Sequence, residues 1–288
     1  MMLPDAGLLP FSPSGMPRQN IQAAYICFRS RHVVLRFDMP EILSSAMSIF
    51  GGMLSSTPIG TPAGTIEIAT DAHGLGIEEN GLTAEERFDS PAAAVRDMYH
   101  RAVKQLIGSS PGLLWIHGGV VAKNGKALLF TAPSGQGKST LVAYFVAQGW
   151  TYLSDELAPI DPSAATVLPF PIVPYMRDSQ RNDLALEEVR ALDKIQVRLA
   201  EDAIGKTALP LSGIYFLSYL PATTGAEISH CPPSLAVVEM LRNSLNPGES
   251  RTKEIANLCR LMQQAHAKYL RYSSAAAAAT AIARAHLF

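Results

Sequence analysis

One stretch, residues 130–156, constrains the fold more than any other, and it reads FTAPSGQGKSTLVAYFVAQGWTYLSDE. An apolar strand leads into a loop of small residues, and Lys138 then opens an apolar run with helical spacing. Gly149 is expected to end this helix. Residues 150–153 are typical of a second strand, which ends on the polar residues 154–156. This order of strand, glycine-rich loop and helix predicts a phosphate-binding loop.

The chemistry of such a loop assigns roles to its residues. Successive backbone N–H groups converge on the phosphates, and the start of the following helix adds partial positive charge. We expect Lys138 to reach the outer phosphates without a structural duty of its own, and the hydroxyl of Ser139 to bind Mg²⁺. Ala132 stands where the usual pattern has its first glycine, and because alanine is small we expect a tightened turn that keeps the site. The predicted nucleotide-binding residues are Ser134, Gly135, Gln136, Gly137, Lys138, Ser139 and Thr140.

Two adjacent carboxylates follow the second strand. Asp155 is placed to accept the proton of a substrate hydroxyl or to hold Mg²⁺. Asp155 and Glu156 would repel each other unless a cation lay between them, which favours a metal site. The alternative is a solvated acidic turn.

Composition excludes several classes of function. The 288 residues carry a net charge of −1, so there is no bulk attraction to nucleic acid or to an anionic membrane. No apolar run approaches the length of a membrane span, and the N-terminus lacks a signal-peptide pattern. Cys27, Cys231 and Cys259 are far apart, which favours buried thiols in a reducing cytoplasm over disulfides or a metal site. We therefore expect a cytoplasmic protein with no nucleic-acid or membrane partner, and a homo-oligomer stays open.

Two parts of the chain precede the loop. Residues 1–18 are rich in Pro, Gly and Ser and predict a disordered or extended tail. Residues 19–110 predict an α+β region, with Ser90 as the N-cap of a helix that ends near residue 107. Its other expected elements are strands at 21–28, 32–37 and 65–70, a helix at 40–50 and a loop at 51–64.

A hairpin signal sets the surroundings of the loop in residues 111–288. Asn124-Gly125 lies between two apolar runs, which is the strongest short-range signal for a hairpin. The strand that feeds the loop is therefore predicted to pair antiparallel with the strand that carries His117. A standard P-loop NTPase has a parallel core instead, so the pattern indicates a different P-loop architecture.

The rest of the chain predicts a series of shorter elements. These are a turn at 159–163, a strand near 166–168, a helix-compatible half from residue 184 to 200, a strand at 213–217 with 227–229 as its antiparallel partner, and helices at 234–245, 253–267 and 274–285.

These motifs resemble a known family. His117-Gly118 and residues 132–140 and 149–156 are similar to the catalytic domain of bacterial HPr kinase/phosphorylase. They look closer still to the HPr-kinase-like kinases found beside peptide-modification genes. The resemblance is specific over about residues 113–161. It implies an α/β P-loop domain with a mixed sheet, akin to phosphoenolpyruvate carboxykinase, and Mg²⁺-dependent phosphoryl transfer from ATP to a hydroxyl.

The resemblance also implies roles for individual residues. It favours Asp155 as the base and Glu156 as the metal ligand, and it raises a positioning role for His117, a residue type that on an apolar strand is more often structural. Asp155-Glu156 stands where the family has Asp-Asp, and no HLEIRG-type signature occurs in residues 169–214. The resemblance therefore does not extend to the phosphorylase reaction or to HPr as substrate.

Cationic side chains are also needed to neutralise a transferred phosphoryl group. Arg177, Arg181 and Lys206 are the candidates, each of them equally compatible with an ordinary surface charge.

The predicted function is an ATP- and Mg²⁺-dependent kinase that acts on a serine-type hydroxyl of a peptide or protein. Two alternatives remain: a kinase for a small molecule, and a nucleotide-binding regulatory module without turnover. A carboxylate beside the loop argues against the module, because binding alone needs no base.

Overall fold

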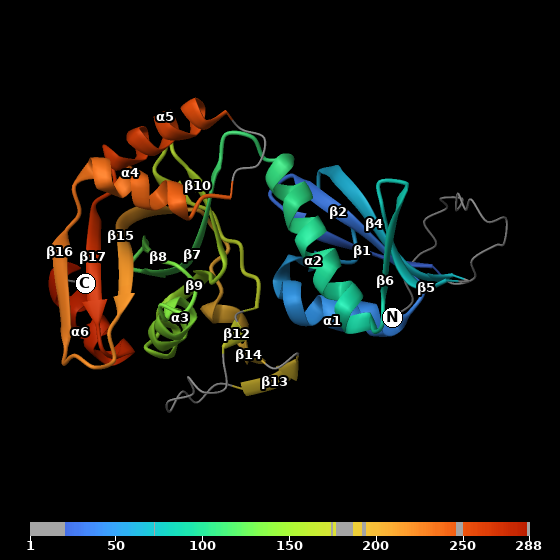
Figure 1. Ribbon diagram of the computed structural model, residues 1–288, viewed down its shortest axis with the longest axis horizontal. Helices are drawn as coiled ribbons and strands as arrows, with labels where there is room; N and C mark the ends of the chain where they lie inside the picture. The colour runs from blue at the N-terminus through green and yellow to red at the C-terminus, as the bar shows by residue number, and fades with distance from the viewer. Residues whose placement is uncertain are drawn as a thin grey trace. The chain divides into compact units, whose positions relative to one another are not determined.

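The chain divides into two compact units, Met1–Ser110 and Pro111–Phe288 (Figure 1). A computed structural model describes residues 21–71, 73–173, 175–176, 187–191, 194–245 and 250–286. The predicted tail, Arg177 and Arg181 lie outside the described residues. Within those ranges the chain forms six α-helices and mixed sheets, and none of its helices is long and apolar enough to cross a membrane.

The first unit is built on a six-stranded mixed sheet with the order β3-β1-β2-β4-β5-β6. Its strands are β1 (Gln22–Phe28), β2 (Arg31–Phe37), β3 (Leu54–Ser55), β4 (Thr61–Asp71), β5 (Gly74–Glu79) and β6 (Leu82–Phe88). The strands predicted at 21–28 and 32–37 are confirmed as β1 and β2, which form an antiparallel hairpin with apolar side chains alternating into the core. The parallel pairing of β2 with β4 makes the sheet mixed.

Two helices cover this sheet, α1 (Pro40–Phe50) and α2 (Pro91–Gly108). The predicted cap of α2 is confirmed, because the Ser90 hydroxyl accepts a hydrogen bond from the Ala93 N–H at 3.3 Å. Ile42 and Met98 are among the helix side chains buried in this core.

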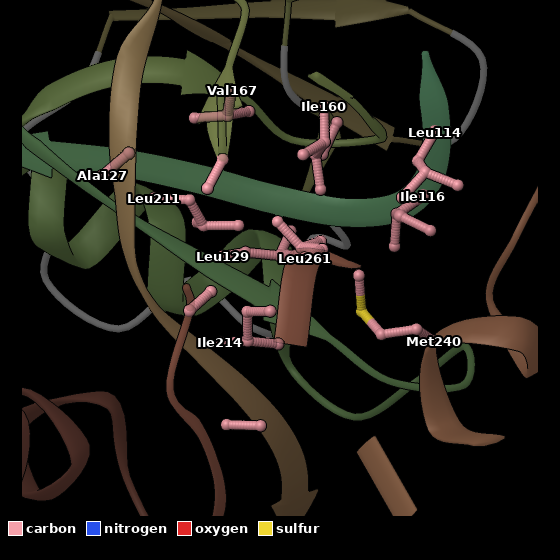
Figure 2. Close-up of a cluster of buried hydrophobic side chains, with 14 of the residues drawn as sticks. Leu114, Ile116, Ala127, Leu129, Ile160, Val167, Leu211, Ile214, Met240 and Leu261 are labelled. Carbon is pink, nitrogen blue, oxygen red and sulfur yellow. The ribbon is translucent and has the colours of Figure 1, made fainter. Parts of the chain in front are cut away.

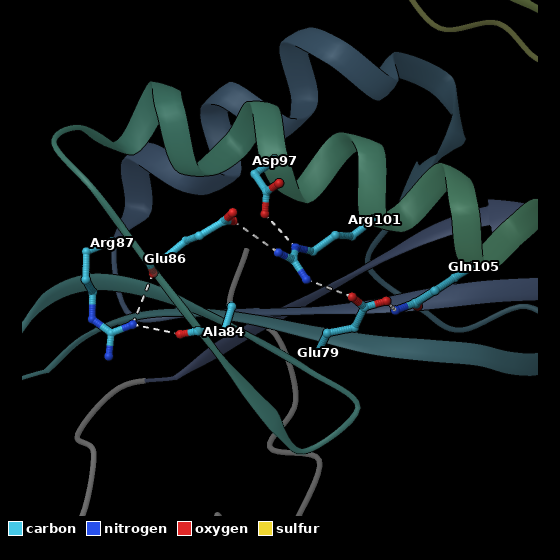
Figure 3. A network of polar contacts seen from close by, with 7 residues as sticks. All are labelled: Glu79, Ala84, Glu86, Arg87, Asp97, Arg101 and Gln105. Carbon is cyan, nitrogen blue, oxygen red and sulfur yellow. Dashed lines mark hydrogen bonds and ion pairs between the residues drawn. The ribbon is translucent and has the colours of Figure 1, made fainter.

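Arg101 joins α2 to the sheet (Figure 3). Its guanidinium contacts Glu79 of β5 at 2.9 Å, Glu86 of β6 at 3.5 Å and Asp97 one turn earlier on α2. Gln105 donates a second hydrogen bond to Glu79 at 2.8 Å. These contacts raise the pKa of Arg101, and the hydrogen bond to Asp97 is the largest cause. The contacts to Glu79 and Glu86 hold the β5–β6 hairpin against α2.

The structure corrects two expectations in this unit. β4 begins at Thr61, inside the segment predicted as a loop, because residues 61–64 already pair with β2. The β5–β6 hairpin was not predicted, although Asn80-Gly81 turns it with both residues at positive φ.

The second unit contains an eight-stranded mixed sheet with the order β11-β10-β7-β8-β15-β17-β16, in which β9 also pairs with β7. The strands are β7 (Leu114–Lys123), β8 (Lys126–Thr131), β9 (Thr151–Ser154), β10 (Leu157–Asp161), β11 (Thr166–Val167), β15 (Leu209–Tyr219), β16 (Ala226–His230) and β17 (Ala267–Tyr272). The predicted β7–β8 hairpin is confirmed, with Asn124 at φ 51° and Gly125 at φ 74°.

Helices close both faces of this sheet, and they are α3 (Lys138–Ala147), α4 (Pro233–Arg242), α5 (Arg251–Met262) and α6 (Ala275–His286). On one face, α3 and α6 bury Phe145 and Ile282 against Phe130 of β8. On the other, apolar side chains of the sheet pack in one cluster with Met240 of α4 and Leu261 of α5 (Figure 2). The strands β7, β8, β15, β11 and β10 form a closed ring around this second core, because β11 pairs with both β10 and β15.

Several expectations for this unit are wrong. β10 runs through to Asp161 because it pairs with β7 and, at its end, with β11, so the turn predicted at 159–163 starts later. Residues 227–229 pair with β17 and not with β15, since β17 lies between them. The helix predicted to end at residue 267 ends at Met262, and residues 267–272 form β17.

The prediction that residues 184–200 are compatible with a helix is also wrong where the structure describes them. There the backbone forms a hairpin of β13 (Glu187–Ala191) and β14 (Lys194–Arg198), and β14 also pairs with β12 (Tyr175–Met176). The β-branched residues Ile195 and Val197 alternate with polar residues, which favours a strand over a helix.

Candidate functional site

Strand directions bring the predicted site residues to one edge of the second sheet. β7 runs antiparallel to both β8 and β9, so β8 and β9 run parallel to each other on its two sides. Thr131 at the end of β8 faces Gly118, and Ser154 at the end of β9 faces Val120. The loop after β8 and the carboxylates after β9 therefore leave the sheet at neighbouring positions.

The glycine loop, residues 132–137, connects β8 to α3. Gly135 (φ 86°) and Gly137 (φ 79°) adopt the left-handed conformation that glycine tolerates best. Ser134 and Gly135 are exposed, and a Cβ added to Gly135 would meet open space. α3 starts directly after Gly137, so no N-cap side chain competes for the first N–H groups of the helix. This combination suits an anionic group placed at the loop.

Ala132 departs from the usual pattern without strain. The non-glycine residues with positive φ in the described part of the chain are Arg29, Asn80, Asn124 and Ala165. Ala132 is thus in an ordinary backbone conformation, and it is buried at the end of β8. Alanine at this position costs no conformational energy.

Lys138 has a structural role that the sequence did not predict. Its side chain is 7% exposed, and its ammonium group donates hydrogen bonds to the carbonyls of Ala132 at 2.7 Å and Pro133 at 3.2 Å. Burial lowers the pKa of Lys138, while the charges of Asp155 and Glu156 oppose that shift. The expectation that Lys138 has no structural duty is therefore wrong: it cross-links the base of the glycine loop.

Asp155 and Glu156 lie between β9 and β10, and both of these strands pair with β7. The acidic pair thus follows the end of β9, as predicted, and the chain then continues along β7 as β10, which was not predicted. The carbonyl of Glu156 accepts a hydrogen bond from the Gly118 N–H at 3.1 Å, which fixes the acidic pair against β7. Asp155 is only 7% exposed, which does not fit the alternative of a solvated turn.

His117 lies half-buried on β7, beside both groups. Its backbone N–H donates to the Asn243 carbonyl at 2.7 Å, and its ring hydrogen-bonds to the backbone of Glu156. Burial lowers the pKa of His117, the charge of Lys138 lowers it further, and Glu156 opposes both effects. The imidazole is therefore neutral at neutral pH and is coupled electrostatically to Lys138 and Glu156.

The remaining candidates are placed less closely. Ser139 and Thr140 are half-buried in the first turn of α3. Lys206 is exposed, and the parallel bridge between Tyr152 and Ile204 directs its segment along β9 toward the edge that holds Asp155.

The donor set suits a hard cation that is shared with a ligand. Among the described residues, no group of three or more His, Cys, Asp or Glu side chains could hold a metal. Mg²⁺ is usually bound by one or two carboxylates together with substrate phosphates and water. Ser139 and Glu156 carry a hydroxyl and a carboxylate, which are the kinds of oxygen donor that this pattern uses.

The comparisons with known proteins add little to this geometry. No protein-family model and no curated protein sequence matches the chain. Among solved structures, the Hpr(Ser) kinase/phosphatase from Coxiella burnetii is similar with a TM-score of 0.31 and 8% identity, over 60% of this chain and 95% of that one. A likeness at that level carries no argument, so the function rests on the residues themselves.

Sequence reasoning missed two tyrosines at the loop. Tyr272, at the end of β17, donates a hydrogen bond to the Gln136 carbonyl at 2.7 Å. The backbone N–H of Tyr219, at the end of β15, donates to the Gln136 side chain at 2.9 Å. The two tyrosines in KYLRY, residues 268–272, favour a strand and could have revealed β17.

Proposed function

We propose that the second unit is an ATP- and Mg²⁺-dependent kinase that phosphorylates a serine-type hydroxyl on a peptide or protein. One observation carries the proposal. The strands on the two sides of β7 lead to the two groups: β8 ends at the glycine loop with its lysine, and β9 ends at a buried carboxylate. A loop alone would support nucleotide binding. A buried Asp155 beside it supplies what transfer to a hydroxyl needs in addition, a group that can take a proton.

The residues divide the work as follows. The N–H groups of the glycine loop and the start of α3 bind the phosphates, and Lys138 leaves the Ala132 and Pro133 carbonyls to meet the outer phosphates. Ser139 and Glu156 would hold Mg²⁺, which neutralises charge on the phosphates when bound. Neutral His117 positions the acidic pair through its bond to the Glu156 backbone.

The reaction balances with these groups. The acceptor oxygen forms a bond to the γ-phosphorus of ATP, the bond from that phosphorus to the bridging oxygen breaks, and ADP leaves with the electron pair. The proton of the acceptor hydroxyl passes to Asp155. The choice of a peptide or protein as acceptor rests on the family resemblance alone, and a small-molecule acceptor is an outcome of the test.

The experiment has two stages. ATP should raise the melting temperature more in the presence of Mg²⁺ than in the presence of a chelator, because Ser139 and Glu156 complete a metal site only with phosphate oxygens. ADP release should then rise on addition of serine-containing peptides. Equal shifts with Mg²⁺ and chelator would remove the metal site. Binding of ATP without ADP release for any peptide or small alcohol would favour the regulatory module.

A further inference from the structure

The end of β17 lies at the glycine loop because the strands β8, β15 and β17 are mutually parallel neighbours. Parallel strands deliver their carboxyl ends to the same edge of a sheet. Tyr272, the last residue of β17, is 3% exposed, and its hydroxyl donates to the backbone carbonyl of Gln136 at 2.7 Å. Tyr272 therefore contacts the loop directly, although it lies 136 positions after Gln136 in the chain.

That contact fixes the direction of a neighbouring donor. The peptide unit between Gln136 and Gly137 is planar and trans, so its carbonyl and its N–H point in opposite directions. With the carbonyl held toward Tyr272, the Gly137 N–H must point away from β17. A glycine residue at φ 79° has little steric preference to keep this orientation by itself.

Two further contacts restrict the same peptide unit. The Gln136 side-chain oxygen accepts a hydrogen bond from the Tyr219 N–H at 2.9 Å, and the rings of Tyr219 and Tyr272 lie 5.5 Å apart. A Cβ added to Gly137 would lie 2.5 Å from the Tyr272 hydroxyl, so this position has room for glycine alone. Gln136 thus connects the loop to β15 through its side chain and to β17 through its backbone carbonyl.

The donor in this contact is stable over the working range of pH. Burial raises the pKa of the Tyr272 hydroxyl well above its usual value, with Tyr219 as a smaller cause. Tyr272 therefore stays protonated and keeps donating to Gln136.

We propose that Tyr272 is a positioning residue for nucleotide binding, which aims the Gly137 N–H at the phosphates by holding the Gln136 carbonyl from behind. This inference rests on the proposed function of the glycine loop. It predicts an effect on affinity for the nucleotide, since the hydroxyl touches neither the substrate nor the reacting atoms.

The test compares two Tyr→Phe changes on one strand. Tyr272→Phe removes the hydroxyl and keeps the ring, and Tyr269→Phe is the matched control because its hydroxyl bonds Cys231 on the opposite face of β17. Affinities for ATP and ADP are measured by calorimetry, beside melting temperatures. A lost hydrogen bond of ordinary strength should raise the Kd of both nucleotides about threefold to tenfold for Tyr272→Phe. Tyr269→Phe should stay within about twofold of the wild-type affinity.

A steady-state measurement separates positioning from general damage. Tyr272→Phe should raise KM for ATP and leave kcat nearly unchanged, because saturating ATP restores the loop. Gln136→Met, which removes the Tyr219 contact and leaves β17 intact, should weaken binding in the same sense. If the wild-type protein binds the nucleotides and Tyr272→Phe has the same Kd, the inference is wrong. It is also wrong if Tyr269→Phe loses as much affinity as Tyr272→Phe. In both cases the proposed function stands. A wild-type protein that binds neither nucleotide would overturn the proposed function, and the inference with it.

Discussion

Lys138 and Asp155 bring opposite charges into positions that are each 7% exposed. Burial of a charge is costly unless a partner of opposite sign is near, and the acidic pair supplies this partner for Lys138. Yet desolvation remains the largest effect on the pKa of Lys138 and lowers it. The residue therefore stays charged at a cost to stability, while its hydrogen bonds hold the base of the glycine loop.

This balance predicts the behaviour of Lys138→Met. Transfer should fall at least about 10²-fold, because the phosphates lose their cation, and nucleotide affinity should fall as well. The melting temperature near pH 7 should change little, since removal of a desolvated charge opposes the loss of the two hydrogen bonds to the loop carbonyls. The folded pKa lies below 10.5, so the unfolded chain binds the proton more tightly and wild-type stability should gain on the variant as pH rises toward that value. Melting curves at pH 7 and pH 10 check this, and full transfer activity in the variant would contradict it.

At the scale of elements, β7 organises the site because it pairs with β8, β9 and β10. Gly119 lets its neighbours approach: an added Cβ would lie 2.4 Å from the Val142 side chain of α3 and 3.4 Å from Asp155 Oδ1. A glycine in a central strand weakens it unless another group needs the space. Here both the helix of the glycine loop and the acidic pair need it.

Gly119→Ala should therefore be destabilising by about 1–3 kcal/mol, the usual cost of overpacking a core. The companion variant is Gly119→Ala with Val142→Ala, which removes the group that the new methyl would strike. Chemical denaturation should show that the double variant is more stable than the sum of the two single changes predicts. Simple additivity would mean that Val142 is not what excludes a side chain at position 119.

Local signals explain which elements could be predicted. Asn124-Gly125 identified the β7–β8 hairpin, Ser90-Pro91 started α2, and Gly149 ended α3, because each signal lies within the element it controls. β17 and the continuation of β9 into β10 escaped, since they depend on pairing with strands distant in sequence. The candidate site divides in the same way. Its loop and carboxylates are contiguous motifs, whereas Tyr272 reaches the loop only through the folded sheet.

At the scale of the whole molecule, every residue that we assign to the site belongs to the unit Pro111–Phe288. That unit has its own buried clusters on both faces of its sheet. A domain with its own core can fold alone. We therefore expect residues 111–288 to form the site by themselves.

Expression of residues 111–288 alone should give a folded protein with the ATP affinity of the full chain. Circular dichroism and calorimetry check both properties, and residues 21–110 serve as the control that should bind no ATP. A folded fragment that has lost ATP binding, while the full chain binds, would show that the first unit contributes to the site.

The central claim is that Asp155 takes a proton during transfer, and one substitution tests it most directly. Asp155→Asn keeps the shape of the side chain and removes the base. We expect nucleotide affinity to stay within a few-fold, while the rate of phosphoryl transfer from ATP falls by about 10²–10⁴. A fall in affinity that extra Mg²⁺ partly reverses would make Asp155 a metal ligand instead. An unchanged rate with unchanged affinity would contradict the account and leave a nucleotide-binding module.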